Sequence, residues 1–277
     1  MPVLRVVTFN TLFGGHTDSG FGPADRWDGQ MAFLRSLKPD ILALQECNFW
    51  EVLGRQRLHR AVRQLGMARG FLAEANVTTA GHRFHSAILL SSRVAVDAED
   101  ADRTRYHHVM GWANLRLEGV DGLVELRNLH LDPSDPRNRT REVGPLKFLA
   151  GPGRKSLIVG DLNAIGIGFP EPDWTRLPQH QLDCHLHAPG HGPGQIADRE
   201  AVELLARAGF VDAAARFGQE TVPTAAFGVD DVPRRQDLIL ASPALAPALV
   251  GYRVHKEAVD GGLSDHAAVV ADFDLTV

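Results

Sequence analysis

Short apolar segments constrain the fold of this chain more than any other feature of its sequence. They are typical of buried strands, because they are too short to form helices that bury one face. They lie at Leu4–Phe9, Ile41–Leu44, Ala87–Leu90, Leu157–Val159, Leu238–Leu240 and Val269–Val270. Between the first of them, Trp27–Leu37 and Glu51–Leu65 repeat apolar residues with the period of a helix and stop before Pro39 and at Gly66. This alternation predicts an α/β class of fold.

The middle of the chain predicts a hairpin and two further helices. Trp112–Leu117 and Leu123–Leu131 flank a turn-rich connection and so indicate an antiparallel pair, which makes a mixed sheet the expectation. Helices are expected at Thr140–Leu149 and at Arg199–Ala208. Ala164–Asp198 is rich in Pro, Gly and His and lacks clear periodicity. We interpret it as a loop that shapes a substrate site, because it is longer than an ordinary connection.

Composition narrows the class of protein. A chain of 277 residues with 44% hydrophobic residues can bury one large core, so we expect a single domain over residues 1–277. The first strand begins at Val3 and no apolar stretch approaches the roughly 20 residues of a membrane span, which predicts a soluble, cytoplasmic protein. Two cysteines are too few for a disulfide framework. A net charge of −5 argues against a broad nucleic-acid-binding surface.

Polar residues close three of the apolar runs. Asn10, Glu46 and Asp161 each follow a predicted strand. One such residue would be unremarkable, since strand ends are exposed and polar residues begin turns. Several strand ends can converge on one edge of a layered α/β protein and form an oxygen-rich pocket there. Such a pocket suits Mg2+, and Glu46 is the best candidate for a direct ligand.

Two further segments offer acid–base chemistry. His266 lies just before the apolar run at residues 267–270, and Asp237 opens the run at residues 237–240. Together they resemble a His–Asp relay, in which the carboxylate fixes the tautomer of the ring and supports its cation. His130 stands at another strand end and could donate to a phosphoryl oxygen or protonate a leaving group. A lone histidine in such a place is more often structural.

These residues belong to six short blocks that resemble one known family. The blocks are Thr8-Phe9-Asn10, Leu44-Gln45-Glu46, Asn128-Leu129-His130, Gly160-Asp161-Leu162-Asn163-Ala164, Gln236-Asp237-Leu238-Ile239-Leu240 and Ser264-Asp265-His266. In this order they resemble the endonuclease/exonuclease/phosphatase superfamily, which includes DNase I-like nucleases, apurinic-site endonucleases, sphingomyelinases and inositol-polyphosphate phosphatases. The resemblance implies a four-layer α/β sandwich, with two mixed β-sheets packed face to face and helices outside. It also implies a site at one edge of the sheets.

The resemblance assigns a metal site. Glu46 would ligate Mg2+, with Mn2+ as the alternative ion. Asn10 would ligate the ion or orient its water, and Asp265 would complete the metal environment. Apurinic-site enzymes carry an acidic residue two positions after the first-strand asparagine, where this chain has Leu12. The number of metal ions is therefore left open.

The resemblance also assigns catalytic roles. Asp161 would position the nucleophilic water, and Asn163 would donate to a non-bridging phosphate oxygen. His266, oriented by Asp237, would act as general base or phosphate stabiliser, and His130 would contact the phosphate from the other side. The implied reaction is hydrolysis of a phosphate mono- or diester by direct attack of water, without a covalent enzyme intermediate.

Three functions follow from this assignment. The first is a metal-dependent phosphoesterase that acts on a small or exposed phosphoester, favoured by the negative net charge, the four lysines and the loop Ala164–Asp198. The second is a Mg-dependent endo- or exonuclease on DNA or RNA. The third is a catalytically silent binding module of the same fold. The sequence does not indicate an oligomeric state.

Other clusters have two readings each. Five residues in the loop could form a zinc site, but we favour the interpretation that they belong to a solvated loop or contact the substrate. These residues are His180, Cys184, His185, His187 and His191. His107 and His108 could contact the pocket rim, although surface exposure is favoured. Three arginines could clamp a phosphate or pair with Asp132 and Asp135 on the surface; they are Arg137, Arg139 and Arg141.

Overall fold

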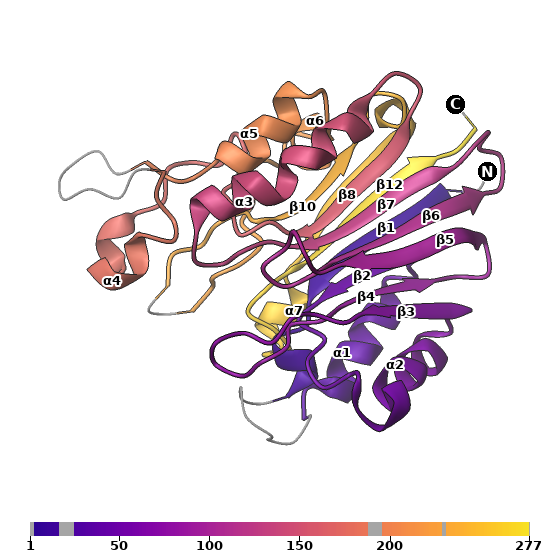
Figure 1. Cartoon of the computed structure of the whole chain (residues 1–277), viewed down its shortest axis with the longest axis horizontal. Coiled ribbons are helices and arrows are strands. Elements are labelled where there is room, and N and C mark those ends of the chain that lie inside the picture. Colours follow the sequence, from indigo (N-terminus) through magenta and orange to yellow (C-terminus); the bar gives the residue numbers. More distant parts are fainter. Residues whose placement is uncertain (1–2, 17–24, 188–195, 229–230, 277) are drawn as a thin grey trace.

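The apolar runs become strands of two six-stranded sheets (Figure 1). The computed structural model describes residues 3–16, 25–187, 196–228 and 231–276. The first sheet has the order β11 (Leu249–His255), β12 (Ala268–Asp274), β1 (Val3–Asn10), β2 (Ile41–Gln45), β4 (Ser86–Leu90) and β3 (Arg69–Ala73). The second has the order β5 (Val94–Asp102), β6 (Met110–Leu117), β7 (Val124–His130), β8 (Lys155–Asp161), β10 (Asp237–Ala241) and β9 (Val211–Asp212).

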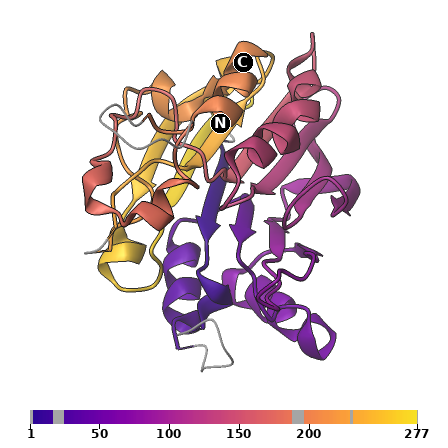
Figure 2. The same ribbon diagram turned by 60° about the vertical axis from the view of Figure 1, so that its left-hand side comes forward.

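Both sheets are mixed, as the sequence predicts. In each sheet one parallel pair lies among antiparallel neighbours: β1 with β2 in the first, and β7 with β8 in the second. The predicted hairpin is the antiparallel pair β6–β7. Figure 2 shows the yellow C-terminal strands beside the indigo β1, and β1 pairs with β12 in antiparallel register.

Alternate residues of the central strands serve two different cores. Val6 and Ile41 point into the core between the sheets, whereas Val7 and Leu42 pack with the helices on the outer face. In the second sheet, Val159 joins the core between the sheets and its neighbour Ile158 joins the outer one. Successive strand side chains point to opposite faces, so a strand covered on both faces is continuously apolar. This explains why the runs show no alternation of apolar and polar residues.

Helices cover the two outer faces and complete four layers. Figure 1 shows α1 (Trp27–Ser36) and α2 (Val52–Leu65) on one side and α3 (Pro136–Val143) and α5 (Glu200–Arg207) on the other. The shorter elements are η1 (Phe13–Gly15), η2 (Gly144–Ala150), η3 (Trp174–Arg176), α4 (Gln179–Leu182), α6 (Ala213–Arg216), η4 (Ala246–Ala248) and α7 (Glu257–Asp260). The predicted sandwich is therefore confirmed. No helix in the described residues is long and apolar enough to span a bilayer.

Two helices differ from the sequence-based expectation. The helix expected over Thr140–Leu149 is divided into α3 and the 3-10 segment η2, because Pro145 lacks the N–H that would continue an α-helix. Val52 lies in the segment Glu51–Leu65, whose periodicity predicts a helix with its apolar residues turned inward, but it is 41% exposed. The three residues after it have positive φ angles, so the regular helical face begins later.

Part of the long segment after Asn163 is folded. In its described parts it contains η3 and α4 around a small apolar cluster that includes Trp174 and Leu182. The buried Arg139 binds it by an ion pair of 2.8 Å to Asp198 and by a hydrogen bond to the carbonyl of Cys184. Arg139 is therefore a structural anchor and is not available to clamp a phosphate. Arg137 and Arg141 are exposed.

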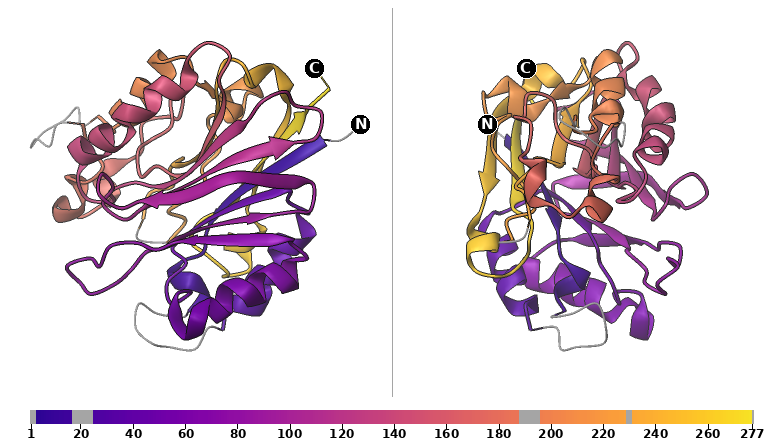
Figure 3. Two further views of the ribbon diagram at one scale, coloured as in Figure 1. Left: turned by 45° about the vertical axis from the view of Figure 1, so that its right-hand side comes forward. Right: turned by 90° about the vertical axis from the view of Figure 1, so that its left-hand side faces the viewer.

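The topology separates the chain ends from one edge of the sandwich. Val3 begins β1 and pairs with Asp274 near the end of β12, and the two termini lie near each other in both views of Figure 3. Asn10 lies at the opposite end of β1, and His266 lies just before the start of β12. That opposite edge carries the predicted site residues.

Candidate active site

Asp161 lies at the centre of the site because two strands flank it. The register places His130 of β7 on one side of it and Asp237 of β10 on the other. Gly160 allows the close approach of β7, since its φ is 131° and a Cβ there would lie 2.0 Å from the carbonyl oxygen of Leu129. From the sequence alone, Gly160 is recognisable only as the residue before Asp161, and its close contact with β7 is not predicted.

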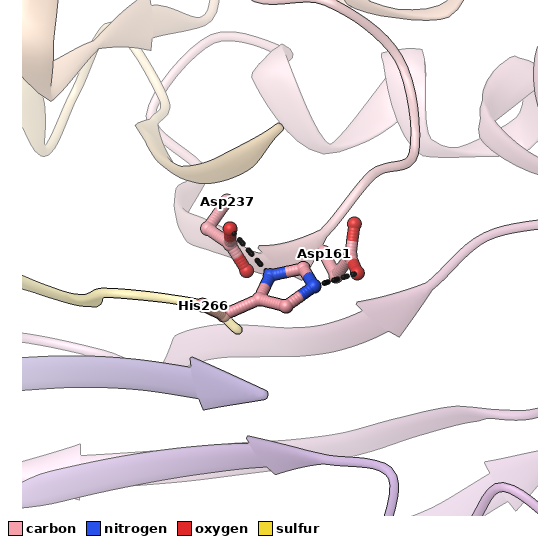
Figure 4. A group of neighbouring side chains, drawn as sticks. All are labelled: Asp161, Asp237 and His266. Carbon is pink, nitrogen blue, oxygen red and sulfur yellow. Dashed lines mark hydrogen bonds and ion pairs between the residues drawn. The ribbon is translucent and has the colours of Figure 1, made fainter. Parts of the chain in front are cut away.

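His266 links the two sheets across this edge. Its Nδ1 lies 2.9 Å from Oδ2 of Asp237, and its Nε2 lies 3.8 Å from Oδ2 of Asp161 (Figure 4). Thr224 fixes Asp237 from behind, because its hydroxyl oxygen accepts the Asp237 backbone N–H at 3.0 Å. All three charged side chains are buried. With Nδ1 occupied by Asp237, Nε2 is the ring nitrogen that points towards Asp161 and Asp265.

The electrostatics of the pair favour a charged ring. Burial alone would lower the pKa of His266, but Asp237, Asp161 and Asp265 raise that pKa well above its ordinary value. For the acid Asp237 burial has the opposite effect and raises the pKa, whereas the positive charge of the His266 ring lowers it. The two groups therefore act as one buried unit that holds a proton near Nε2.

Asn10 and Glu46 form the neighbouring part of the site. The amide nitrogen of Asn10 donates to Glu46 at 3.1 Å and to Asp161 at 3.2 Å, while its oxygen accepts from the Leu12 backbone at 3.0 Å. The second oxygen of Glu46 accepts the Phe13 N–H at 3.0 Å. In this orientation the amide nitrogen of Asn10 bridges two carboxylates, and its oxygen accepts from the backbone of Leu12.

A cation suits this group of carboxylates. Burial, assisted by the charge of Asp265, raises the pKa of Glu46 to about 7. The nearby positive groups therefore do not fully stabilise the charged form of this carboxylate. Asp265 is half-exposed, and its Oδ1 lies 4.0 Å from Nε2 of His266. Carboxylate oxygens, one of them open to solvent, match the preference of Mg2+ for oxygen ligands and retained water. The residues present therefore fit a hydrated divalent ion beside Glu46 and Asp265.

Arg26 is a charged neighbour that the sequence analysis missed. Its charge interacts with the Glu46 and Asp265 carboxylates, and burial lowers its pKa below the ordinary value. Its Nη2 donates to the carbonyl of Leu12 at 2.8 Å. No motif marks Arg26, since it lies 20 residues before Glu46 in a region without a strand.

Asn163 supports Asp161 and also faces the site region. Its backbone N–H donates to Oδ1 of Asp161 at 2.9 Å, and its side-chain nitrogen donates to the carbonyl of Leu131 at 3.0 Å. Gln236 donates to its side-chain oxygen at 3.4 Å. Asn163 has a φ of 50°, a left-handed conformation that asparagine tolerates better than most residues. The turn thus fixes the direction of the Asp161 carboxylate.

His130 approaches Asp161 from the side opposite Asp237. Its Nε2 lies 3.8 Å from Oδ2 of Asp161, the same separation as for His266. Burial first, then the charges of His266 and His107, lower the pKa of His130 to about 3. His130 is consequently a neutral hydrogen-bonding group, in contrast to His266.

The sequence matches the family model described as endonuclease/exonuclease/phosphatase family over residues 7–266. The chain belongs to this family. The match spans every residue of the site from Asn10 to His266. No curated protein matches the sequence.

Solved structures of the family share the fold at low sequence identity. An endonuclease/exonuclease/phosphatase family protein from Leptotrichia buccalis C-1013-b has a TM-score of 0.66 and 14% identity, over 98% of this chain and 99% of that chain. D. rerio TDP2 complexed with single-strand DNA product gives 0.63 and 17%, over 98% and 99%. An AP endonuclease from Archaeoglobus fulgidus gives 0.61 and 17%, over the same shares.

A group of polar residues lies behind His130, in which His107 is exposed as expected and His108 is not. His108 was expected at the surface but is 2% exposed, and its ring stacks on His130 with centroids 4.5 Å apart and planes at 31°. His107 contacts His108 edge-on and lies 3.1 Å from the Asp132 carboxylate. Glu142 accepts the backbone N–H groups of His107 and Asp132. A local sequence pattern offers no signal for this network, because its members come from three segments.

The histidine-rich segment does not assemble as a zinc site in its described part. His191 lies outside the described residues. His185 is stacked on Trp174, and Cys184 donates to a backbone carbonyl. His187 lies 4.0 Å from Glu200. Among the described residues, no three members of this cluster lie close enough together to share an ion.

Proposed function

We propose that this protein is a divalent-metal-dependent phosphoesterase that hydrolyses a phosphate mono- or diester by direct attack of water. The observation that carries the proposal is the meeting of two carboxylates and a paired imidazole ring at one edge. They are the Glu46 carboxylate, the Asp161 carboxylate and the paired His266 ring. Direct hydrolysis needs a place for a cation, an anchor for water and a proton carrier, and these groups match those needs.

Glu46 and Asp265 would hold Mg2+, with Mn2+ as the alternative. When bound, the ion would offset the negative charge that grows on the phosphoryl oxygens. Asn10 keeps Glu46 and Asp161 at fixed positions through its two hydrogen bonds. This arrangement reduces the reorganisation that charge development would otherwise require.

Asp161 and His266 would manage the attacking water. The 3.8 Å between their facing atoms is too long for a good direct hydrogen bond, which leaves room for a shared reacting group nearby. Asp161 would orient the water, and Nε2 of His266 would take its proton or donate to the phosphate. Asp237 keeps Nδ1 occupied, so the proton moves at Nε2 alone.

His130 and Asn163 would bind the non-bridging phosphate oxygens. The neutral His130 ring can donate one hydrogen bond through Nε2 when its proton lies on that nitrogen. The side-chain nitrogen of Asn163 uses one hydrogen for Leu131 and has a second that can donate to the phosphate. These donors would stabilise the equatorial oxygens without adding formal charge.

A small phosphoester is the substrate class that we favour. The net charge is −5, and the segment after Asn163 is anchored to α3 through Arg139. A fixed wall suits a compact ligand, whereas a duplex needs an extended basic surface. Cleavage of DNA or RNA is the second candidate, because two of the similar structures are TDP2 with single-strand DNA and an AP endonuclease. A silent binding module would be expected to lack part of the acid–base set.

A hydrolysis panel tests the proposal. It would include phosphomonoesters, bis-p-nitrophenyl phosphate, sphingomyelin, single- and double-stranded DNA and RNA, each with Mg2+, with Mn2+ and with EDTA. We expect turnover to require a metal ion and to fall by about 100-fold or more in Glu46→Gln, which keeps the shape of the side chain and removes its charge.

The matched control is Glu118→Gln, because Glu118 is exposed in the turn between β6 and β7. Full turnover in EDTA, or an unchanged Glu46→Gln enzyme, would contradict the proposal. If plasmid DNA is nicked faster than every small phosphoester and Glu46→Gln abolishes the nicking, the nuclease is the correct reading. If the protein hydrolyses none of these substrates, the result favours a catalytically inactive binding module.

A further inference from the structure

A continuous row of aromatic rings runs from His130 to the backbone that holds Glu46. His108 lies against Phe84 with ring centroids 5.0 Å apart, and His130 meets the same ring edge-on at 6.2 Å. Phe84 in turn contacts Phe13 at 5.5 Å and His82 at 6.1 Å. Phe84 is therefore the ring that joins the histidine side of the site to the Glu46 side.

The exposed end of the row is held in place by unusual backbone geometry. Leu12 and Phe13 have φ angles of 50° and 53°, which non-glycine residues rarely adopt because they strain the backbone. Three contacts stabilise this turn: the Phe13 N–H to Glu46, the Leu12 N–H to Asn10, and Arg26 to the Leu12 carbonyl. The same contacts that position Glu46 thus position the ring of Phe13.

Burial decreases along the row. His108 and His130 are buried, whereas Phe13, His82 and Phe84 are half-exposed. Half-exposed aromatic rings that are fixed beside a polar centre offer a flat apolar surface to a ligand. His82 adds an imidazole edge with a hydrogen-bond donor and an acceptor at the exposed end. The three rings meet at interplanar angles of 53° to 72°, so each offers its own face to a ligand, and the His82 edge can recognise heteroatoms.

We infer that Phe13, His82 and Phe84 form a subsite that stacks a planar heteroaromatic ring of the substrate, such as a nucleobase attached to the scissile phosphoester. The inference rests on the proposed function, because it takes the phosphate to lie between Glu46 and His130. Stacking of one base on aromatic side chains contributes about 1–3 kcal/mol. An aliphatic chain would cover the rings but would leave the His82 edge without a matching polar partner.

Calorimetry with three phosphates in Mg2+ tests the subsite. The ligands are adenosine 5′-monophosphate, ribose 5-phosphate, which lacks only the base, and octyl phosphate, which carries an aliphatic chain. We expect the nucleotide to bind about 5- to 150-fold more tightly than the sugar phosphate, as stacking of one base implies. Octyl phosphate should bind no more tightly than ribose 5-phosphate.

Two variants of Phe84 separate stacking from apolar contact. Phe84→Leu removes the ring and should abolish the advantage of the nucleotide over ribose 5-phosphate, measured as the ratio of their two dissociation constants. Phe84→Tyr keeps the ring and should retain the advantage. The matched control is Phe148→Leu, since Phe148 is 66% exposed and lies on η2. Phe13→Leu is the second test if the thermal midpoint of Phe84→Leu shows that it folds poorly.

The outcomes distinguish the subsite from the phosphate site. If ribose 5-phosphate binds and Glu46→Gln weakens it, but the base adds nothing, the subsite is wrong and the proposed function stands. Equal binding of octyl phosphate and the nucleotide also overturns stacking and identifies an apolar subsite. If none of the three phosphates binds, the phosphate site and the subsite are both wrong.

Discussion

The two sheets repeat one strand arrangement with different chemistry. The parallel pair β1–β2 of the first sheet ends in Asn10 and Glu46, and the parallel pair β7–β8 of the second ends in His130 and Asp161. The first pair presents a carboxylate suited to a metal ion, whereas the second presents a ring beside a carboxylate. The comparison shows that topology creates two equivalent positions for polar side chains. In the proposed function the first position would offset charge through a bound cation, and the second would orient water and the phosphate for the proton carrier His266.

Neither half is a complete site, so the alignment of the sheets matters. His266 lies on the segment that leads into β12 of the first sheet, yet its partner Asp237 is on β10 of the second. Behind the site, Asn128 of β7 accepts from Gln45 at 2.7 Å and donates to the carbonyls of Leu44 and Ala87. These buried bonds join the second sheet to β2 and β4 of the first. They fix the position of Glu46 relative to Asp161.

The largest expected effect comes from removing the proton carrier that spans both sheets. His266→Ala should lower kcat by about 10²- to 10⁴-fold, the usual contribution of a general acid–base group. Asp237→Asn should cost less, because the ring remains. Since the Asp237 charge raises the pKa of His266, this variant should also lower that pKa. The acid limb of the kcat/KM profile, where a base must lose its proton, should then move to lower pH.

Steady-state kinetics across pH check this comparison, with His59→Ala as the matched control because His59 is exposed on α2. An acid limb that stays in place in Asp237→Asn would show that His266 does not titrate as the base. Equal losses in the two variants would indicate that Asp237 has a part of its own in the reaction.

A smaller effect is expected from breaking the contact between the sheets. Asn128→Leu keeps a similar volume but removes one hydrogen-bond partner from the Gln45 amide, which keeps Thr8, and one from each of two backbone carbonyl groups. We expect the free energy of unfolding to fall by roughly 2–5 kcal/mol, because each buried polar group that loses a partner costs about 1–3 kcal/mol. Urea unfolding measures this change, and the exposed Asn76→Leu is the matched control. An Asn128→Leu protein as stable as the wild type would show that apolar packing alone aligns the sheets.

The sequence predicts well those features that depend on local pattern. Continuous apolar runs identify strands buried on both faces, and the residue after each run falls at a sheet edge, as Asn10 and Glu46 do. The resemblance adds the four-layer order, which the strand arrangement confirms. The catalytic and metal-binding roles of the site residues stay predictions, although the structure brings their side chains together.

The features that the sequence does not predict depend on distant partners. Arg139 and Asp198 are 59 residues apart and form a buried ion pair, so a polar stretch of sequence was interpreted as surface. His108 is buried because Phe84 and His130 cover it, and neither is a near neighbour in the sequence. Polar residues are mostly exposed, and their burial depends on partners that a local pattern does not identify.

The smallest effect on kcat should come from removing the His108 ring that packs against His130. This contact between rings is found in the second sheet's half of the site and not in the first sheet's half. His108 covers one face of the His130 ring, whereas the first sheet holds its Asn10 and Glu46 side chains by hydrogen bonds. An aromatic pair contributes about 0.5–1.5 kcal/mol beyond burial, so His108→Ala should lower kcat by roughly 2- to 10-fold. His108→Phe preserves the ring face and should restore most of kcat, because His108 touches the neighbouring ring and not the substrate.

Separate measurement of kcat and KM in His108→Ala decides whether His108 positions the His130 ring. If the stack orients His130 for a contact that strengthens in the transition state, His108→Ala should lower kcat with little change in KM. If the stack serves only stability, His108→Ala should lower the thermal midpoint and leave kcat unchanged at temperatures where the protein is folded. Failure of His108→Phe to recover kcat would instead assign the effect to a ring nitrogen. The Nδ1 atoms of His108 and His130, both buried, would then be the groups to examine.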